Sequence, residues 1–99
     1  MKTKIYLLVI FLLSINLYSQ TAEEYFERGY VKAHLKKYEE AIEDYTKAIA
    51  INPNYAMAYY NRGIAKNLIG DTDGACSDWR KALSLGLKDV LYFINQNCK

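Results

Sequence analysis

The chain has 99 residues, of which 13 are Lys or Arg and 11 are Asp or Glu, so its formal net charge is +2. This length corresponds to one small domain. With a single His and two Cys, the chain offers no set of metal ligands. We also find no Ser with a paired base and no phosphate-binding glycine loop, so no catalytic residue, cofactor or metal is expected.

The first 19 residues have the layout of a secretory signal peptide. Two lysines precede an apolar run over residues 5–17, and Ser19 supplies the small residue of a cleavage site. The run is shorter than the roughly 20 residues of a membrane-spanning helix. We therefore expect residues 1–19 to be removed and the mature domain, residues 20–99, to be periplasmic or extracellular. The alternative is an uncleaved segment that tethers the same domain to the outside of a membrane.

Removal of residues 1–19 takes away two Lys and no acid, which leaves 11 basic and 11 acidic side chains. The formal charge of the mature domain is then zero. A protein that binds nucleic acid through its phosphates needs a basic excess on one face. Nucleic acid is therefore not an expected partner.

Two helices are predicted in the first half of the mature domain. Residues 22–36 and 39–51 carry apolar side chains at spacings of three and four, the period of a helix with an apolar face. Pro53 ends the second helix, because proline lacks an amide hydrogen and disfavours helical geometry in the residue before it. Asn54 is expected to cap the helix that follows.

Three further helices are predicted in the second half. The third and fourth cover residues 55–69 and 73–85, and Gly86 is expected to end the fourth in a left-handed conformation. A fifth, over residues 88–98, is expected to cover the open end of the domain, because a terminal repeat otherwise exposes its packing face. The predicted fold class is all-α, with five helices in the mature domain.

The mature domain repeats itself with a period of 34 residues. Fixed-period self-similarity of this kind marks a stacked repeat architecture. Shifting residues 22–53 by one period superimposes nine identical residues. The identical pairs are Ala22 and Ala56, Tyr25 and Tyr59, Arg28 and Arg62, Gly29 and Gly63, Lys32 and Lys66, Ala41 and Ala75, Asp44 and Asp78, Lys47 and Lys81, and Ala48 and Ala82.

The period and the residue pattern resemble two tandem tetratricopeptide repeats. The glycine, alanine and aromatic positions of the family motif fall on Gly29, Ala41 and Tyr45, and one period later on Gly63, Ala75 and Trp79. The resemblance implies a right-handed superhelical stack of antiparallel helix pairs, an α-solenoid. Repeat one is expected at 22–55, repeat two at 56–87 and a capping helix at 88–98. Glycine and alanine at these positions are expected to let the helices approach closely.

One charged pair recurs with the repeat. Arg28 and Asp44 are followed one period later by Arg62 and Asp78. Either an ion pair within or between the repeats or separate solvated charges worth little free energy fits this pattern.

The two cysteines are placed for a disulfide. Cys76 lies 11 residues before residue 87 and Cys98 lies 11 after it, so both lie at the same height on two antiparallel helices. In an exported protein this placement favours a bridge, which would close a loop of 22 residues and stabilise the fold by about 3 kcal/mol. Two free thiols are the alternative. The chain has no C-x-x-C spacing typical of a thiol redox protein.

The resemblance also implies a concave face lined by the first helix of each repeat. The positions that it maps there include two apolar stripes on adjacent helices. The predicted groove residues are Phe26, Tyr30, His34, Met57, Tyr60, Ile64 and Asn67. Alternatively, the aromatic rings only seal the contact between the repeats.

We interpret the chain as an exported, non-enzymatic adaptor that binds a peptide or protein through this groove. Phe26 and Tyr30 stand where the family's terminal-carboxylate site needs Lys and Asn, so that mode of binding is not expected. The first alternative is a structural module that self-associates through its N-terminal end into a homodimer or a longer array. A thiol redox protein is the second alternative.

Overall fold

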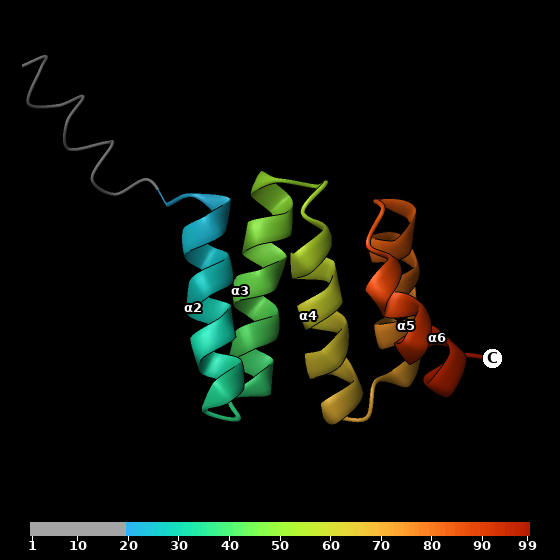
Figure 1. Ribbon diagram of the computed structural model, residues 1–99. Coiled ribbons are helices and arrows are strands. Elements are labelled where there is room, and N and C mark those ends of the chain that lie inside the picture. Colours follow the sequence, from blue (N-terminus) through green and yellow to red (C-terminus); the bar gives the residue numbers. More distant parts are fainter. Residues whose placement is uncertain (1–19) are drawn as a thin grey trace, which may run out of the picture.

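The computed structural model describes residues 20–99, and the predicted signal peptide at residues 1–19 lies outside the described residues. Helices and turns make up this part of the chain, which confirms the predicted all-α fold. Figure 1 shows the helices standing side by side as two antiparallel hairpins, with α6 lying at the C-terminal end. The elements are α2 (Ala22–His34), α3 (Tyr38–Ile51), α4 (Ala56–Leu68), α5 (Thr72–Ser84), the 3-10 helix η1 (Lys88–Val90) and α6 (Leu91–Asn97). None of these helices has the length and hydropathy of a membrane span.

Two of the helices begin at side-chain caps. The Thr21 hydroxyl accepts a hydrogen bond from the Glu24 amide at 3.2 Å at the start of α2. A carboxylate oxygen of Asp71 accepts from the Gly74 amide at 2.9 Å at the start of α5. Each cap satisfies an amide that has no partner within its own helix, and so fixes where the helix begins.

The prediction that Asn54 caps the third helix is wrong. Tyr55 holds the N-cap position of α4, and no side chain caps this helix end. The amide of Asn54 instead donates to the side-chain oxygen of Asn52 at 3.1 Å. Asn52 thus forms a local turn around Pro53, and this turn draws Asn54 away from the first turn of α4.

Left-handed residues end three of the helices. Gly86 has φ 101°, as predicted, and Gly70 has φ 93°. Lys36 occupies the position one period before Gly70 and has φ 61°. The first helix therefore ends at His34 and not at the predicted residue 36. A side chain is unusual in this conformation, which explains why the sequence pattern around Lys36 did not indicate the turn.

Within each hairpin, a glycine lies against a large aromatic side chain. A Cβ on Gly29 would lie 2.9 Å from Cε1 of Tyr45, and a Cβ on Gly63 would lie 2.6 Å from Nε1 of Trp79. Both aromatic residues are almost fully buried. The two glycines are therefore required for close approach, as the sequence predicted.

An aromatic cluster follows the same plan in both repeats. In repeat one the Phe26 ring lies 5.7 Å from that of Tyr45 and 5.1 Å from that of Tyr55, which begins the next hairpin. In repeat two the ring of Phe93, on α6, lies 5.4 Å from that of Trp79. Phe93 also lies 5.5 Å from the Tyr60 ring. The capping segment thus supplies the ring that a following repeat would otherwise provide.

The capping segment is not the single helix predicted over residues 88–98. The 3-10 helix η1 comes first, and α6 is only seven residues long. Val90, at the junction, is fully buried and joins the apolar cluster around Ala75, Trp79 and Ala82. The change of helix type lets the chain turn Val90 onto α5 before α6 begins, a use typical of short 3-10 segments.

Candidate functional site

A hollow of about 270 Å³ opens where the two repeats meet. Its walls come from the first helix of each repeat and its floor from α3. The lining residues are Tyr30, Ala33 and His34 of α2, Tyr38 and Tyr45 of α3, and Asn61, Ile64, Ala65 and Leu68 of α4.

The α2 wall of the hollow is aromatic. Tyr30 is 48% exposed, and the His34 ring lies 4.3 Å from the Tyr30 ring. Nδ1 of His34 is 2.9 Å from the backbone oxygen of Tyr30. Because that oxygen can only accept, Nδ1 carries the proton and donates. The other ring nitrogen, Nε2, is left without a hydrogen-bond partner among the described residues.

The floor and the α4 wall combine apolar surface with unused hydrogen-bonding groups. Burial raises the pKa of Tyr45 to about 12, so its hydroxyl keeps its proton at neutral pH. The side-chain nitrogen of Asn61 donates to the Met57 carbonyl at 3.1 Å, which leaves the amide oxygen of Asn61 as an acceptor. Ile64 and Leu68 supply apolar surface, and Leu68 is 57% exposed. No residue that lines the hollow is Asp, Glu, Lys or Arg.

The structure brings three of the seven predicted groove residues together in the hollow, namely Tyr30, His34 and Ile64. Two others do not line the hollow and pack against aromatic neighbours. Phe26 stacks in the aromatic cluster of repeat one, and Tyr60 meets the ring of Phe93 edge to face.

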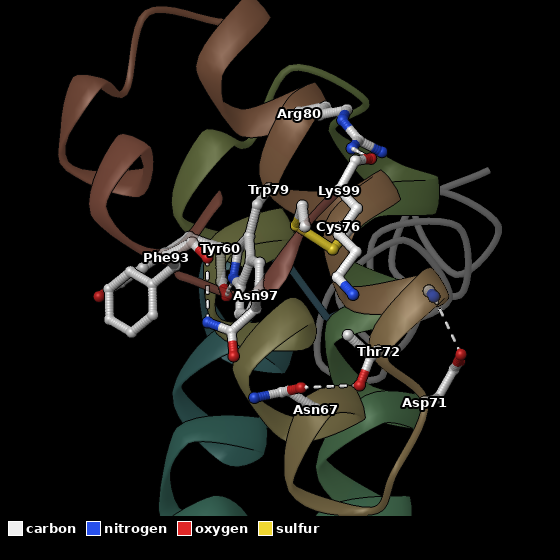
Figure 2. Close-up of a disulfide and its surroundings, with 12 residues drawn as sticks. Tyr60, Asn67, Asp71, Thr72, Cys76, Trp79, Arg80, Phe93, Asn97 and Lys99 are labelled. Carbon is white, nitrogen blue, oxygen red and sulfur yellow. Dashed lines mark hydrogen bonds between the residues drawn. A yellow bond between two sulfur atoms is a disulfide. The ribbon is translucent and has the colours of Figure 1, made fainter. Parts of the chain in front are cut away.

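The remaining two predicted residues also lie outside the hollow. Met57 is 41% exposed on α4. The side-chain oxygen of Asn67 accepts from the Thr72 hydroxyl at 3.2 Å, a bond between α4 and α5 that is visible in Figure 2.

Six lining residues are not among the seven predicted groove residues, and three of these six carry a polar side-chain group: Tyr38, Asn61 and Tyr45. Tyr38 is the first residue of α3, and its counterpart one period later is a threonine, so the repeat pattern gave no signal there. Tyr45 fits the motif as a packing residue, and its second role at the floor of the hollow depends on the gap between α2 and α4. The unused hydrogen-bonding capacity of Asn61 becomes evident only from its contact with Met57.

A second feature, away from the hollow, is a buried carboxylate in each hairpin. Asp44 is only 1% exposed. Its oxygens lie 2.7 Å from Nη2 of Arg28 and 2.9 Å from Nζ of Lys32. Burial alone raises the pKa of Asp44, but the hydrogen bonds from Arg28 and Lys32 outweigh this effect and hold the pKa below its ordinary value of 3.8. The recurring charges therefore form ion pairs within the hairpin and are not separate solvated groups.

The same arrangement recurs one period later. The carboxylate oxygens of Asp78 lie 2.7 Å from Nη2 of Arg62 and 3.1 Å from Nζ of Lys66. Arg62 also donates from Nη1 to the Thr46 hydroxyl at 3.2 Å, and this bond joins α4 to α3. The ion pairs thus stabilise each hairpin, while Arg62 links one hairpin to the next.

Replacing Asp44 with Asn is expected to lower the free energy of unfolding by about 1–3 kcal/mol at neutral pH, because charge-assisted hydrogen bonds are lost. The folded-state pKa of Asp44 is lower than its unfolded value. Its stabilising effect is therefore present above about pH 4 and is lost as the pH falls toward the folded pKa. Urea unfolding at about pH 7 and about pH 3 should show the difference between the parent and Asp44→Asn shrinking in acid.

The control for this measurement is Glu40→Gln, which removes an exposed acid from the same helix. We expect it to change the unfolding free energy by less than about 0.5 kcal/mol. A difference between the parent and Asp44→Asn that stays constant down to about pH 3 would contradict the assignment.

A third feature connects the capping segment to α5. The structure joins Cys76 and Cys98, with their sulfur atoms 2.00 Å and their Cα atoms 5.7 Å apart. Figure 2 shows this bond beside the Trp79 side chain. The two cysteines thus lie close enough for the disulfide expected from the sequence. In addition, residues 20–99 contain no group of three or more His, Cys, Asp or Glu placed to hold a metal ion.

Two stacked helix hairpins, an end cap and a shared inner hollow define a helical-repeat protein of the α-solenoid class. Comparison with family models agrees, since the model described as TPR repeat matches residues 29–70. The chain belongs to the tetratricopeptide repeat family, which confirms the resemblance seen in the sequence. Proteins of this family generally bind protein partners, and their fold is typically a scaffold without enzymatic activity. The chain is accordingly a protein–protein interaction module.

Solved structures of MamA are similar to this chain. One, described as the crystal structure of MamA, superimposes with a TM-score of 0.66 and 32% sequence identity over 67% of this chain. Another, described as the crystal structure of MamA protein, gives a TM-score of 0.67 and 31% identity over 72% of this chain. The match spans 39% of the length of each MamA chain. No curated protein matches the chain.

Proposed function

We propose that this domain binds a protein partner by taking an uncharged apolar or aromatic side chain of the partner into the hollow between α2 and α4. The observation that supports this proposal is the lining of the hollow, which combines exposed aromatic and aliphatic surface with unused hydrogen-bonding groups and has no charged side chain. The volume, about 270 Å³, lies below the roughly 300–1,000 Å³ of small-molecule pockets. A single side chain of a partner fits this scale.

The chemistry of the lining favours an uncharged occupant. A carboxylate or phosphate in the hollow would lose water without gaining a cationic partner, which is costly. An apolar side chain instead covers the exposed surface of Leu68 and Tyr30, and such burial is favourable. The partner's backbone can then bond to His34 Nε2 and to the Asn61 amide oxygen. Aromatic anchors of this kind carry a large share of binding energy at protein interfaces.

This mode of binding predicts the effect of two substitutions. Peptides selected from a displayed random library on the domain of residues 20–99 are expected to share an uncharged apolar or aromatic anchor. Tyr30→Ala and Leu68→Ala are each expected to weaken the binding of such a peptide about tenfold or more, since an anchor contact is worth more than about 1.4 kcal/mol. Titration calorimetry measures the affinity, and far-UV circular dichroism checks that the helical content is kept.

Met57→Ala is the matched control. Met57 is an exposed apolar residue of α4, but it lies outside the hollow, so we expect the peptide affinity to stay the same. Selected peptides with acidic anchors would contradict the proposal. So would a peptide affinity that falls with Met57→Ala and is unaffected by Tyr30→Ala.

We also propose that the domain is exported and works with the Cys76–Cys98 disulfide formed. The signal-like layout of residues 1–19 and the pairing of both cysteines in the structure support this, because disulfides persist in oxidising compartments. The intact mass of the protein from its native envelope fraction is expected to match a chain that begins at Gln20 and lacks two hydrogen atoms. A mass that includes residues 1–19 would favour the tethered form instead.

A further inference from the structure

Both ends of the stack carry exposed apolar side chains that no described residue covers. At the α2 end, Val31 and Leu35 are 56% and 62% exposed. At the α6 end, Leu91 and Tyr92 are 44% and 66% exposed. Figure 1 shows α2 and α6 at opposite ends of the stack. Clustered exposed apolar residues of this kind mark contact surfaces.

Comparison of α2 with α4, its counterpart one period later, shows what the uncovered face of α2 is suited for: the same face of α4 packs against a neighbouring hairpin. In α4, Ala58 and Ala65 are buried at 0% and 1% exposure where this helix meets the first hairpin. The residues one period earlier are Glu24 and Val31, and both are exposed. The outer face of α2 thus corresponds to the face by which α4 contacts the preceding repeat. Among residues 20–99 no hairpin precedes α2 to cover it.

The two halves of the domain also differ in the sign of their net charge. Residues 20–55 carry seven acidic and five basic side chains, whereas residues 56–99 carry four acidic and six basic ones. The acids in the ion pairs of the described chain are Asp44 and Asp78. Among residues 20–99, the glutamates of α2 therefore have no ion-pair partner at one end, and at the other end neither Lys88 nor the exposed Asp89 beside it has one. Opposite charges of this kind steer association and fix its orientation.

We propose that the outer face of α2 in one copy docks onto the outer face of α6 in a second copy. The α2 face consists of Glu24, Val31 and Leu35, and the α6 face consists of Lys88, Leu91 and Tyr92. We infer a second copy as the occupant because the half of the domain that carries the α2 face has a surplus of acidic side chains and the half that carries the α6 face has a surplus of basic ones. Such a contact joins two different surfaces, so it extends into a head-to-tail row of copies. The hollow between the repeats takes no part in it.

Sedimentation velocity of the domain of residues 20–99 tests this assembly. The mean mass is expected to rise with protein concentration from micromolar to millimolar. It is also expected to fall when salt is raised, because exposed charges are then screened. A domain that stays monomeric over this whole concentration range at low salt would overturn the proposal.

Two blocking variants test the head-to-tail arrangement itself. Val31→Glu places a charge on the α2 face, and Tyr92→Glu places one on the α6 face, so each variant alone is expected to be monomeric. An equimolar mixture of the two is expected to give a complex of twice the monomer mass, because each variant supplies the intact face that the other lacks. Ile51→Glu, at a position 52% exposed and on neither face, is the control and is expected to assemble as the parent does.

A mixture that stays monomeric while the parent assembles would overturn the head-to-tail contact, because the intact α2 face of one variant would then not bind the intact α6 face of the other. Assembly by either blocked variant alone would overturn it as well. Circular dichroism of each variant confirms that the helical content is unchanged. Because neither variant alters a residue of the hollow, peptide binding is expected to persist in both, and so this test is independent of the groove proposal.

Discussion

Trp79→Ala is expected to lower the free energy of unfolding by about 3–5 kcal/mol, the range typical of removing a large buried aromatic side chain. Trp79 is fully buried, and its ring lies 5.4 Å from that of Phe93. Its indole nitrogen donates to the Tyr60 carbonyl at 3.3 Å. A domain of this size has a total stability of about 4–12 kcal/mol, so the variant should be partly unfolded at 37 °C or close to it. Urea unfolding followed by circular dichroism measures the loss, since the substitution removes the chain's only tryptophan.

Two further variants provide comparisons for the expected loss of stability. Trp79→Tyr installs the residue that repeat one carries at the same position, Tyr45, so a smaller loss is expected. Tyr92→Ala removes an aromatic side chain that is 66% exposed, and its effect should stay below about 0.5 kcal/mol. A loss below about 1 kcal/mol for Trp79→Ala would show that the core does not depend on this ring.

The second large effect is expected from opening the disulfide. Replacing both Cys76 and Cys98 with Ser is expected to lower the free energy of unfolding by about 3 kcal/mol, because the bridge closes a loop of 22 residues in the unfolded chain. The corresponding fall in melting temperature is about 12–24 °C for a domain of this size. Differential scanning calorimetry of the parent and the double variant measures it.

The parent treated with a dithiol reductant should melt at the same temperature as the double variant, since both lack the bridge. Reductant should leave the melting temperature of the double variant unchanged. If reduction does not lower the melting temperature of the parent, the cysteines are not paired in the purified protein.

Most of the fold could be predicted from the repeat period. Identical residues one period apart located all four hairpin helices, and glycines 29 and 63 indicated where helices approach closely. Pro53 and Gly86 indicated two helix ends, because proline interrupts helical hydrogen bonding and glycine readily adopts the left-handed conformation that ends a helix. The turns at Lys36 and Asn52 were missed, because their conformations depend on local hydrogen bonds that the residue types alone do not dictate.

The candidate site was less predictable than the fold. The repeat pattern identifies the inner positions of each first helix, but not which of them are covered by neighbours. Tyr60 and Phe26 have the same place in the motif, yet Tyr60 meets a ring from the capping segment, whose residues follow no repeat. Tyr38 is equally outside the pattern. These outcomes depend on contacts between segments that are distant in the sequence.

The distribution of the ion pairs has a mechanical consequence. The Arg–Asp pairs lie inside the hairpins and stiffen each of them, while a single side-chain hydrogen bond, from Arg62 to Thr46, links α4 to α3. Apolar packing holds the joint between the hairpins instead, since Ala58 of α4 and Ala48 of α3 belong to one buried cluster. The hollow lies across this joint, so the packing of these small side chains sets its width.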